Sequence, residues 1–482
     1  MASVSPQSRA SIAATFGVSE REAGHMIAQL FSGPDGLKSG GAYESGFTWV
    51  LDTNTVRDAA LVLAAEEVSN TLSAPPSARA PEGEGGATST AQKPVITSAC
   101  PGWICYAEKT HPYVLPHVSR LKSPQALAGT LVKSVLAQRY GISPDKVWHL
   151  AVMPCFDKKL EASRSELTST SWDGGKWGES IRDVDCVITA RELLLLASAR
   201  GINLASLPRK PVQHLPFPDP KLNSFLFPHR RKPNGDPTGG SSGGYLWHIM
   251  QTFAARNPGS QIDVSRGRNA DVVEYSLMQG DEVILQSARF YGFRNIQNLV
   301  RRLKPAKLSK IPGAGARRVG ARKPGAANAN GTGSKAEKEY VYVEVMACPG
   351  GCTNGGGQIK AADLGEVGGA VDANVQKEKE KAGPQAQREW LGKVDEAYFS
   401  ASGSEDEDAD AMEIDGPVND DVVNGISTTH ISEIIDHWVQ VTGVEREKLV
   451  FTSYRKVESD VGKKVNDVER VATLAGTIGG GW

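Results

Sequence analysis

The chain has 482 residues, a formal net charge of -1 and 23% charged residues, a composition typical of a folded protein with a substantial core. This charge balance does not favour nucleic acid as a partner, and no apolar run approaches the roughly 20 residues that a membrane span needs. Six cysteines are too few for a secreted disulfide scaffold of this length. We therefore expect reduced thiols and a cytosolic protein.

The first residues are predicted to belong to a folded helix rather than to a targeting peptide. Glu20 and Glu22 are acidic. The apolar residues Ile27, Leu30 and Phe31 follow helical spacing. Ala2 to Val4 resembles the end of a strand whose beginning is missing. We therefore expect a fragment or a truncated gene model.

Further along the chain, short apolar runs alternate with helical patterns. The predicted strands are Val95 to Thr97, Val147 to Met153, Cys186 to Thr189, Glu282 to Ala288 and Tyr340 to Met346. The predicted helices are Gln125 to Tyr140, Ala190 to Ala199, Tyr245 to Arg256 and Asn295 to Leu303. This alternation indicates an α/β fold with mostly parallel sheets, in which ligands gather beyond the carboxyl ends of the strands.

Four stretches break the globular pattern and are predicted to be linkers or surface insertions. They are rich in Pro, Gly and Ala or in charge, and comprise Ser73 to Ala91, Pro208 to Gly244, Lys304 to Lys335 and Lys377 to Asp421. We divide the chain into two lobes, residues 1–200 and 201–365, a charged disordered insertion at 366–425, and a carboxyl-terminal segment at 426–482.

The carboxyl-terminal segment is predicted to be helical and to end in a flexible tail. Ile431 to Val441 has an amphipathic pattern, and Glu445 to Tyr454 continues it. The chain closes on Trp482 after three glycines. A terminal indole with its carboxylate suits a peptide anchor, whereas a Trp packed on its own domain is the structural alternative.

Four cysteines lie in three islands, each where a predicted strand runs into a turn. Cys100 lies in TSACPGW, Cys155 in MPCFDKKLEASR, and Cys348 with Cys352 in ACPGGCTNGGGQ. Four thiolates brought together by tertiary structure form a closed cage typical of a 4Fe-4S cluster, which we favour. A zinc site needs the same four thiolates, and spacing alone does not separate the two.

The residues around these cysteines add to the prediction. Lys158 and Glu161 follow Cys155 on one face of an expected helix, so the ammonium can offset the negative charge of thiolates and sulfide. Cys105 and Cys186 are expected to be structural thiols instead. The scattered histidines are not assigned to metal.

The three islands resemble the three signatures of the catalytic domain of iron-only hydrogenases, in the same order. The match is closest to the eukaryotic hydrogenase-like factors of cytosolic iron-sulfur protein assembly, the nuclear prelamin A recognition factor-like family. The same resemblance includes ASVSPQSRAS near the start, SWDGGKWGESIRDVDCVITARELL from Ser171 to Leu194, and GDEVILQSARFYGFRNIQNLV from Gly280 to Val300. It implies an iron-only hydrogenase large-subunit-like fold of two lobes around a buried iron-sulfur site.

The resemblance implies that Cys100, Cys155, Cys348 and Cys352 hold one 4Fe-4S cluster, with no catalytic residue. Hydrogenases have a proton-relaying cysteine where this chain has Ala99. An alanine carries no labile proton, so we predict a non-catalytic assembly factor. The family also carries an amino-terminal ferredoxin-like segment with a second cluster, and nothing in this sequence matches that segment.

The resemblance further implies partners and a location. The partners are a P-loop NTPase scaffold and a targeting complex that contains a WD40 propeller, with no membrane and no direct contact with nucleic acid. The protein is expected in the cytoplasm and also in the nucleus. A hydrogen-evolving enzyme, a zinc-stabilised scaffold and a prelamin-binding nuclear protein are the alternatives.

Overall fold

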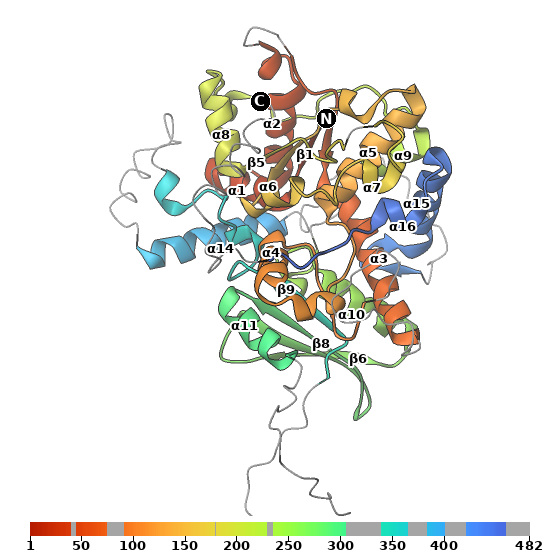
Figure 1. Cartoon of the computed structure of the whole chain (residues 1–482). Helices are drawn as coiled ribbons and strands as arrows, with labels where there is room; N and C mark the ends of the chain where they lie inside the picture. The colour runs from red at the N-terminus through yellow and green to blue at the C-terminus, as the bar shows by residue number, and fades with distance from the viewer. Residues whose placement is uncertain are drawn as a thin grey trace, which may run out of the picture.

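The computed structural model describes residues 1–39, 45–74, 91–178, 180–228, 235–304, 339–364, 383–400 and 421–458. Within these ranges the chain forms a four-stranded sheet, a five-stranded sheet and a small two-stranded sheet. Figure 1 shows the four-stranded sheet in the upper half and the five-stranded sheet in the lower half, with α4 near the level where they meet. Among the described residues, no helix is both long and apolar enough to span a bilayer.

The four-stranded sheet is entirely parallel and is covered on both faces. Its order is β2 (Val50–Asp52), β1 (Ala2–Val4), β4 (Leu150–Met153) and β5 (Cys186–Thr189). The central strands β1 and β4 are buried throughout, as parallel strands between two helical layers usually are. One face packs on α1 (Pro6–Phe16), α2 (Glu20–Ser32) and α8 (Ala190–Ala199).

The five-stranded sheet is mixed. Its order is β3 (Val95–Ile96), β9 (Tyr342–Met346), β8 (Glu282–Tyr291), β7 (Val272–Gln279) and β6 (Gln261–Arg266). The pairs β3/β9 and β8/β9 are parallel, whereas β6, β7 and β8 form an antiparallel meander. Short turns permit only antiparallel pairing between these consecutive strands. Five of the seven strand pairs in the two sheets are parallel, as predicted.

Helices complete the layers around the second sheet and join it to the first. Those near this sheet are α4 (Pro101–Thr110), α10 (Tyr245–Arg256) and α11 (Phe293–Arg302). Those that form the side layer in Figure 1 are α3 (Thr53–Ser73), α5 (Pro124–Tyr140), α9 (Pro220–Leu226), α15 (Thr428–Thr442) and α16 (Arg446–Val450). The remaining elements are α6 (Asp157–Ala162), α7 (Thr170–Asp173), α14 (Pro384–Ser400), β10 (Val422–Val423) and β11 (Ile426–Ser427).

Local sequence explains where several helices begin and end. Ser123 caps α5 by accepting the Ala126 N–H, and Pro124 occupies its first turn. At the other end Gly141 takes the left-handed conformation, with φ of 62°, that closes a helix without a Cβ penalty. These signals are readable in the sequence, and α5 was predicted to within one residue.

The predicted elements agree closely with the observed ones in the apolar parts of the chain. β5, α8 and α10 have the predicted bounds, and α11 begins two residues earlier than predicted. α16 ends at Val450, short of the predicted Tyr454. Strands β2, β6 and β7 were missed. β2 is only three residues long, and the side chains of β6 are partly or fully exposed. β7 buries Val273, Tyr275 and Leu277 in a period-2 pattern that the sequence analysis overlooked.

The prediction of a disordered insertion at 366–425 was wrong for the middle part of this stretch, where helix α14 lies. Trp390, Val394 and Tyr398 repeat every four residues, are buried, and face α1. The Trp390 indole N–H donates to the Ile359 carbonyl at 2.8 Å. A composition dominated by charge concealed this apolar stripe, which is the real signal for an amphipathic helix.

The other boundaries also need correction. The predicted insertion at 208–244 contains α9, whose Leu222 is fully buried. Strand β3 lies in the predicted first lobe, 1–200, yet pairs with β9 of the second sheet, so the sheets do not follow the predicted boundary at residue 200. Most of the predicted insertions 73–91 and 304–335 lies outside the described residues, as does Trp482.

We predict that acid destabilises the fold through His149, just before β4. This side chain is fully buried, its Nε2 lies 2.8 Å from the Ser3 hydroxyl, and burial lowers its pKa to about 3. The unfolded imidazole takes up a proton near its ordinary pKa of 6.5 while the folded one does not. The free energy of unfolding should therefore fall below pH 6.5, by up to about 1.4 kcal/mol per pH unit.

Urea unfolding at pH 7.5 and pH 5 measures this change. His149→Gln, which stays neutral, should lose less stability than the wild type between these two values. An equal loss in both proteins would show that His149 does not carry the effect.

Candidate metal centre

The structure places each of the four predicted cysteines just beyond the carboxyl end of a strand. Cys100 follows β3 and stands at the amino-terminal cap of α4. Cys155 lies between β4 and α6, and Cys348 lies two residues after β9. Cys352 begins the short 3-10 turn Cys352–Asn354. Two sheets therefore deliver the islands, and each does so at the edge where ligands of parallel sheets are usually bound.

Backbone contacts bring the three islands together. The Ala347 N–H, next to Cys348, donates to the Cys100 Sγ at 3.3 Å. The Gly357 N–H, in the third island, donates to the Pro154 carbonyl of the second at 3.0 Å. Each island thus contacts another one, as expected if the cysteines share one site.

The four thiols influence one another electrostatically. Burial raises the pKa of Cys155 and of Cys348 to about 12, and the neighbouring cysteines of the set add to both shifts. Burial also raises the pKa values of Cys100 and Cys352. Without a ligand these thiols keep their protons near neutral pH, so binding of a metal group must displace protons.

Two lysines oppose this effect, since Lys360 lowers the pKa of Cys348 and Lys158 acts on the other three thiols. Lys158, on α6, is largely buried and pairs with the Glu161 carboxylate at 2.7 Å. Its ammonium lowers the pKa values of Cys100, Cys155 and Cys352, although less than burial raises them. The predicted relation between Lys158 and the thiols is thus present in the structure.

The third island rests on a serine pair that the sequence analysis missed. The Cys352 N–H donates to the Ser242 hydroxyl at 3.1 Å. Gly351 has φ of 103°, and a Cβ there would lie 2.5 Å from the Ser241 Oγ. Both serines lie in the stretch predicted to be an insertion, at 208–244. The signal available was the run GGSSGGY directly before the predicted helix at Tyr245.

A buried carboxylate on β9, the strand before the third island, forms hydrogen bonds to two neighbouring segments. Glu344 on β9 is fully buried and accepts the Tyr291 hydroxyl at 2.7 Å and the Leu246 N–H at 2.9 Å. Burial raises the pKa of this carboxyl group. Such a network holds the strand that leads into the third island, and it had no signal in the sequence because its members are distant in the chain.

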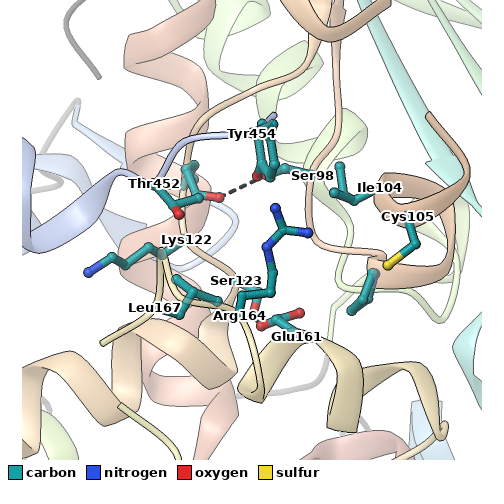
Figure 2. A pocket seen from close by; sticks show the side chains of 12 residues that line it. Ser98, Ile104, Cys105, Lys122, Ser123, Glu161, Arg164, Leu167, Thr452 and Tyr454 are labelled. Atoms are coloured by element: carbon teal, nitrogen blue, oxygen red, sulfur yellow. Dashed lines mark hydrogen bonds between the residues drawn. The ribbon is translucent and has the colours of Figure 1, made fainter. Parts of the chain in front are cut away.

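The remaining candidate residues lie apart from this arrangement. Cys105, on α4, is half-buried and lines a separate small cavity, which Figure 2 shows. Cys186 is partly buried at the start of β5 and packs against the apolar core, as predicted. In the described ranges, no three Cys, His, Asp or Glu side chains are grouped for one metal ion.

The donor set fits a 4Fe-4S cluster in its chemistry. Four thiols is the number that such a cluster takes, and a lysine and close backbone N–H groups lie beside them. A cubic cluster has its irons at separate corners, so its thiolates stand further apart than the about 3.8 Å between sulfurs in a four-thiolate zinc site. The close spacing of side chains that binds a single metal ion is therefore not the spacing that a 4Fe-4S cluster requires.

Comparison with known proteins identifies the family. The model of the iron only hydrogenase large subunit, C-terminal domain, matches residues 1–356. The chain belongs to this family. It is also 63% identical to the cytosolic Fe-S cluster assembly factor NAR1 of Phaeosphaeria nodorum, and the match covers 100% of this chain and 78% of that protein. The factor of the same name from Emericella nidulans is 53% identical, with 100% and 80% covered.

Solved structures confirm the fold. An apo variant of the [FeFe]-hydrogenase HydA1 from Chlamydomonas reinhardtii superposes with a TM-score of 0.56, covering 95% of this chain and 94% of that one at 22% sequence identity. This likeness establishes the hydrogenase-like α/β fold that the sequence predicted. At such identity it says nothing about activity.

We predict that Gly355→Ala separates the second and third islands. A Cβ at Gly355 would lie 2.3 Å from the Pro154 carbonyl oxygen, and this backbone atom cannot move aside cheaply. The substitution should lower the free energy of unfolding by about 1–3 kcal/mol, as overpacking does, and displace Cys155 from Cys352.

Gly392→Ala is the matched control, because it lies exposed in α14 with nothing within 4 Å of the added methyl. It should be neutral or stabilise by up to about 1 kcal/mol. The test compares the melting temperatures of the two variants by thermal unfolding. Equal melting temperatures would show that a methyl group at position 355 fits beside the Pro154 carbonyl.

Proposed function

We propose that the chain binds one 4Fe-4S cluster through Cys100, Cys155, Cys348 and Cys352 and serves in the assembly of cytosolic iron-sulfur proteins. The observation that carries this proposal is similarity over the whole length of the chain, at 52–63% identity, to fungal proteins that are named cytosolic Fe-S cluster assembly factors. At such identity over the full chain, relatives commonly share their role. The hydrogenase-like fold is the scaffold on which that role is built.

The residues of the site support the cluster. Neighbouring cysteines of the set raise the pKa values of Cys155, Cys348 and Cys352, and Lys158 supplies positive charge beside Cys100, Cys155 and Cys352. A bound cluster would provide redox-active iron and inorganic sulfide. The protein would hold it between the two sheets and exclude water from it.

The role is proposed to be non-catalytic. Ala99 stands where hydrogenases have a proton-relaying cysteine, and here its methyl group packs against the apolar core. A methyl group neither donates nor accepts a proton, so the route to a hydrogen-evolving centre is missing its first member.

The partners and compartments follow from the same proposal. The protein would act in the cytoplasm, and in the nucleus for nuclear iron-sulfur proteins. It would link a P-loop NTPase scaffold, where the cluster is made, to a targeting complex that contains a WD40 propeller. Reduced thiols, which the described cysteines all are, suit these compartments.

The first test is the content of the purified protein. Anaerobically prepared chain should contain about four irons and four acid-labile sulfides, with the Mössbauer spectrum of a 4Fe-4S cluster. Cys348→Ala should lose most of the iron and accumulate to a lower level, because an empty cage leaves its loops unsupported. Cys186→Ala, outside the site, should keep both.

Two results would contradict the assignment of a 4Fe-4S cluster. Colourless protein that contains one zinc and no sulfide would indicate a zinc-stabilised scaffold instead. Full iron and unchanged abundance in Cys348→Ala would remove that residue from the ligand set.

The assembly role itself is tested in cells. In fungal cells depleted of their own related factor, we expect the activity of a cytosolic 4Fe-4S enzyme to fall, and this chain should restore it. Cys352→Ala should not restore it, whereas Cys105→Ala should. Hydrogen evolution by the purified protein from a reduced viologen, or restoration by Cys352→Ala, would overturn the proposal.

A further inference from the structure

The chain after α16 crosses the molecule to reach α4, the helix that begins after Cys100. Figure 1 shows this last described segment running from α16 to α4. We call Phe451–Val457 the carboxyl strap. Its first residues pair with the chain before α5, since the Thr452 N–H donates to the Arg120 carbonyl at 2.8 Å and Phe451 forms a bridge with Leu121.

The strap ends on an ion pair that joins α4 to the segment just after α6, and these two helices follow Cys100 and Cys155. Arg164, just after α6, donates two hydrogen bonds to the Glu108 carboxylate of α4, at 2.9 and 2.6 Å. Both side chains are largely buried. Since α4 begins at Cys100 and α6 follows Cys155, this bidentate pair fixes the first two islands relative to each other.

The strap contacts this pair directly. The Arg455 N–H donates to the Glu108 Oε1 at 3.1 Å, and the Val457 N–H donates to the Glu108 carbonyl, also at 3.1 Å. The Tyr454 ring lies against the Arg164 guanidinium, 5.6 Å from its centroid. The strap therefore supplies hydrogen bonds and a cation-π contact to the same two residues.

The strap is not closely packed on its inner side. Figure 2 shows Arg164 between Tyr454 of the strap and Glu161 of α6. These three residues help to line a cavity of about 20 Å³. The Arg164 Nε and the Thr452 hydroxyl are buried there without a hydrogen-bond partner within the described protein. The cavity has room for one water molecule, and the outer residues Arg455 to Val457 are exposed. A segment held in this way opens more readily than the core.

We infer that seating of the carboxyl strap and occupancy of the metal centre are coupled through the Glu108–Arg164 pair. This inference rests on the proposed function. A cluster that joins Cys100 to Cys155 holds α4 and α6 in the arrangement that aligns the pair, and the aligned pair seats the strap. By linkage, a seated strap must strengthen retention of the cluster by the same factor.

The consequence is that loaded and empty protein differ on the surface that the carboxyl strap forms. A protein partner that binds there can distinguish the two forms without touching the cluster. Glu108 and Arg164 are positioning residues in this scheme, since they act on the cluster only through Cys100 and Cys155.

Hydrogen exchange in the full-length protein tests the coupling. Removing the cluster by anaerobic chelation should increase exchange of the Arg455 and Val457 amides about tenfold. Amides of the β7–β8 hairpin, such as Leu277, should change much less. No change at the strap, or an equal change in both places, would overturn the inference.

A pair of variants tests the reverse direction. Val457→Pro removes the N–H that Glu108 accepts, whereas Val457→Ala keeps it. Val457→Pro should release iron to a chelator about tenfold faster than Val457→Ala. The urea midpoints of the two empty variants should agree, so that the difference does not reflect general instability.

The outcomes separate the inference from the proposed function. Equal release rates in two iron-loaded variants would overturn the coupling alone. Wild-type protein without iron and sulfide would overturn the cluster, and the coupling with it.

Discussion

The metal centre depends on contacts between loops that belong to different sheets. The hydrogen bond from Gly357 to the Pro154 carbonyl joins the third island to the second, and the Ala347 N–H on the Cys100 sulfur joins the third to the first. Each is a single bond of roughly 1 kcal/mol net. The arrangement persists because the strands behind the loops are rigid and buried, and because glycines permit the backbones to come this close.

The same buried position explains why the empty centre is chemically unfavourable. Burial and mutual repulsion keep the thiols protonated, and Lys158 corrects this only in part. A group that replaces four protons with metal-sulfur bonds removes that cost and ties the loops together. Loading of the site and stability of the fold are therefore linked, and the Glu108–Arg164 pair extends the link to the surface.

The chain has the hydrogenase-like fold, and we propose for it a non-catalytic role in assembly. That proposal rests on Ala99, whose methyl group packs against the apolar core and neither donates nor accepts a proton. A fold fixes where ligands gather, and individual side chains decide which chemistry follows. The role of this chain is thus read from its residues and its relatives together.

Sequence alone determined the strands that precede the islands, the helices with clear caps, and the candidate ligands, because each of these signals is local. α5 follows from Ser123, Pro124 and Gly141, and the cysteine loops follow from their position after apolar runs. Tertiary structure decided what depends on distant residues. It paired β3 with β9, ordered α14 against α1, and brought Ser242 beneath Cys352. All three contacts join residues more than 100 positions apart. No local pattern encodes which of the many available partners each residue will meet in the folded protein.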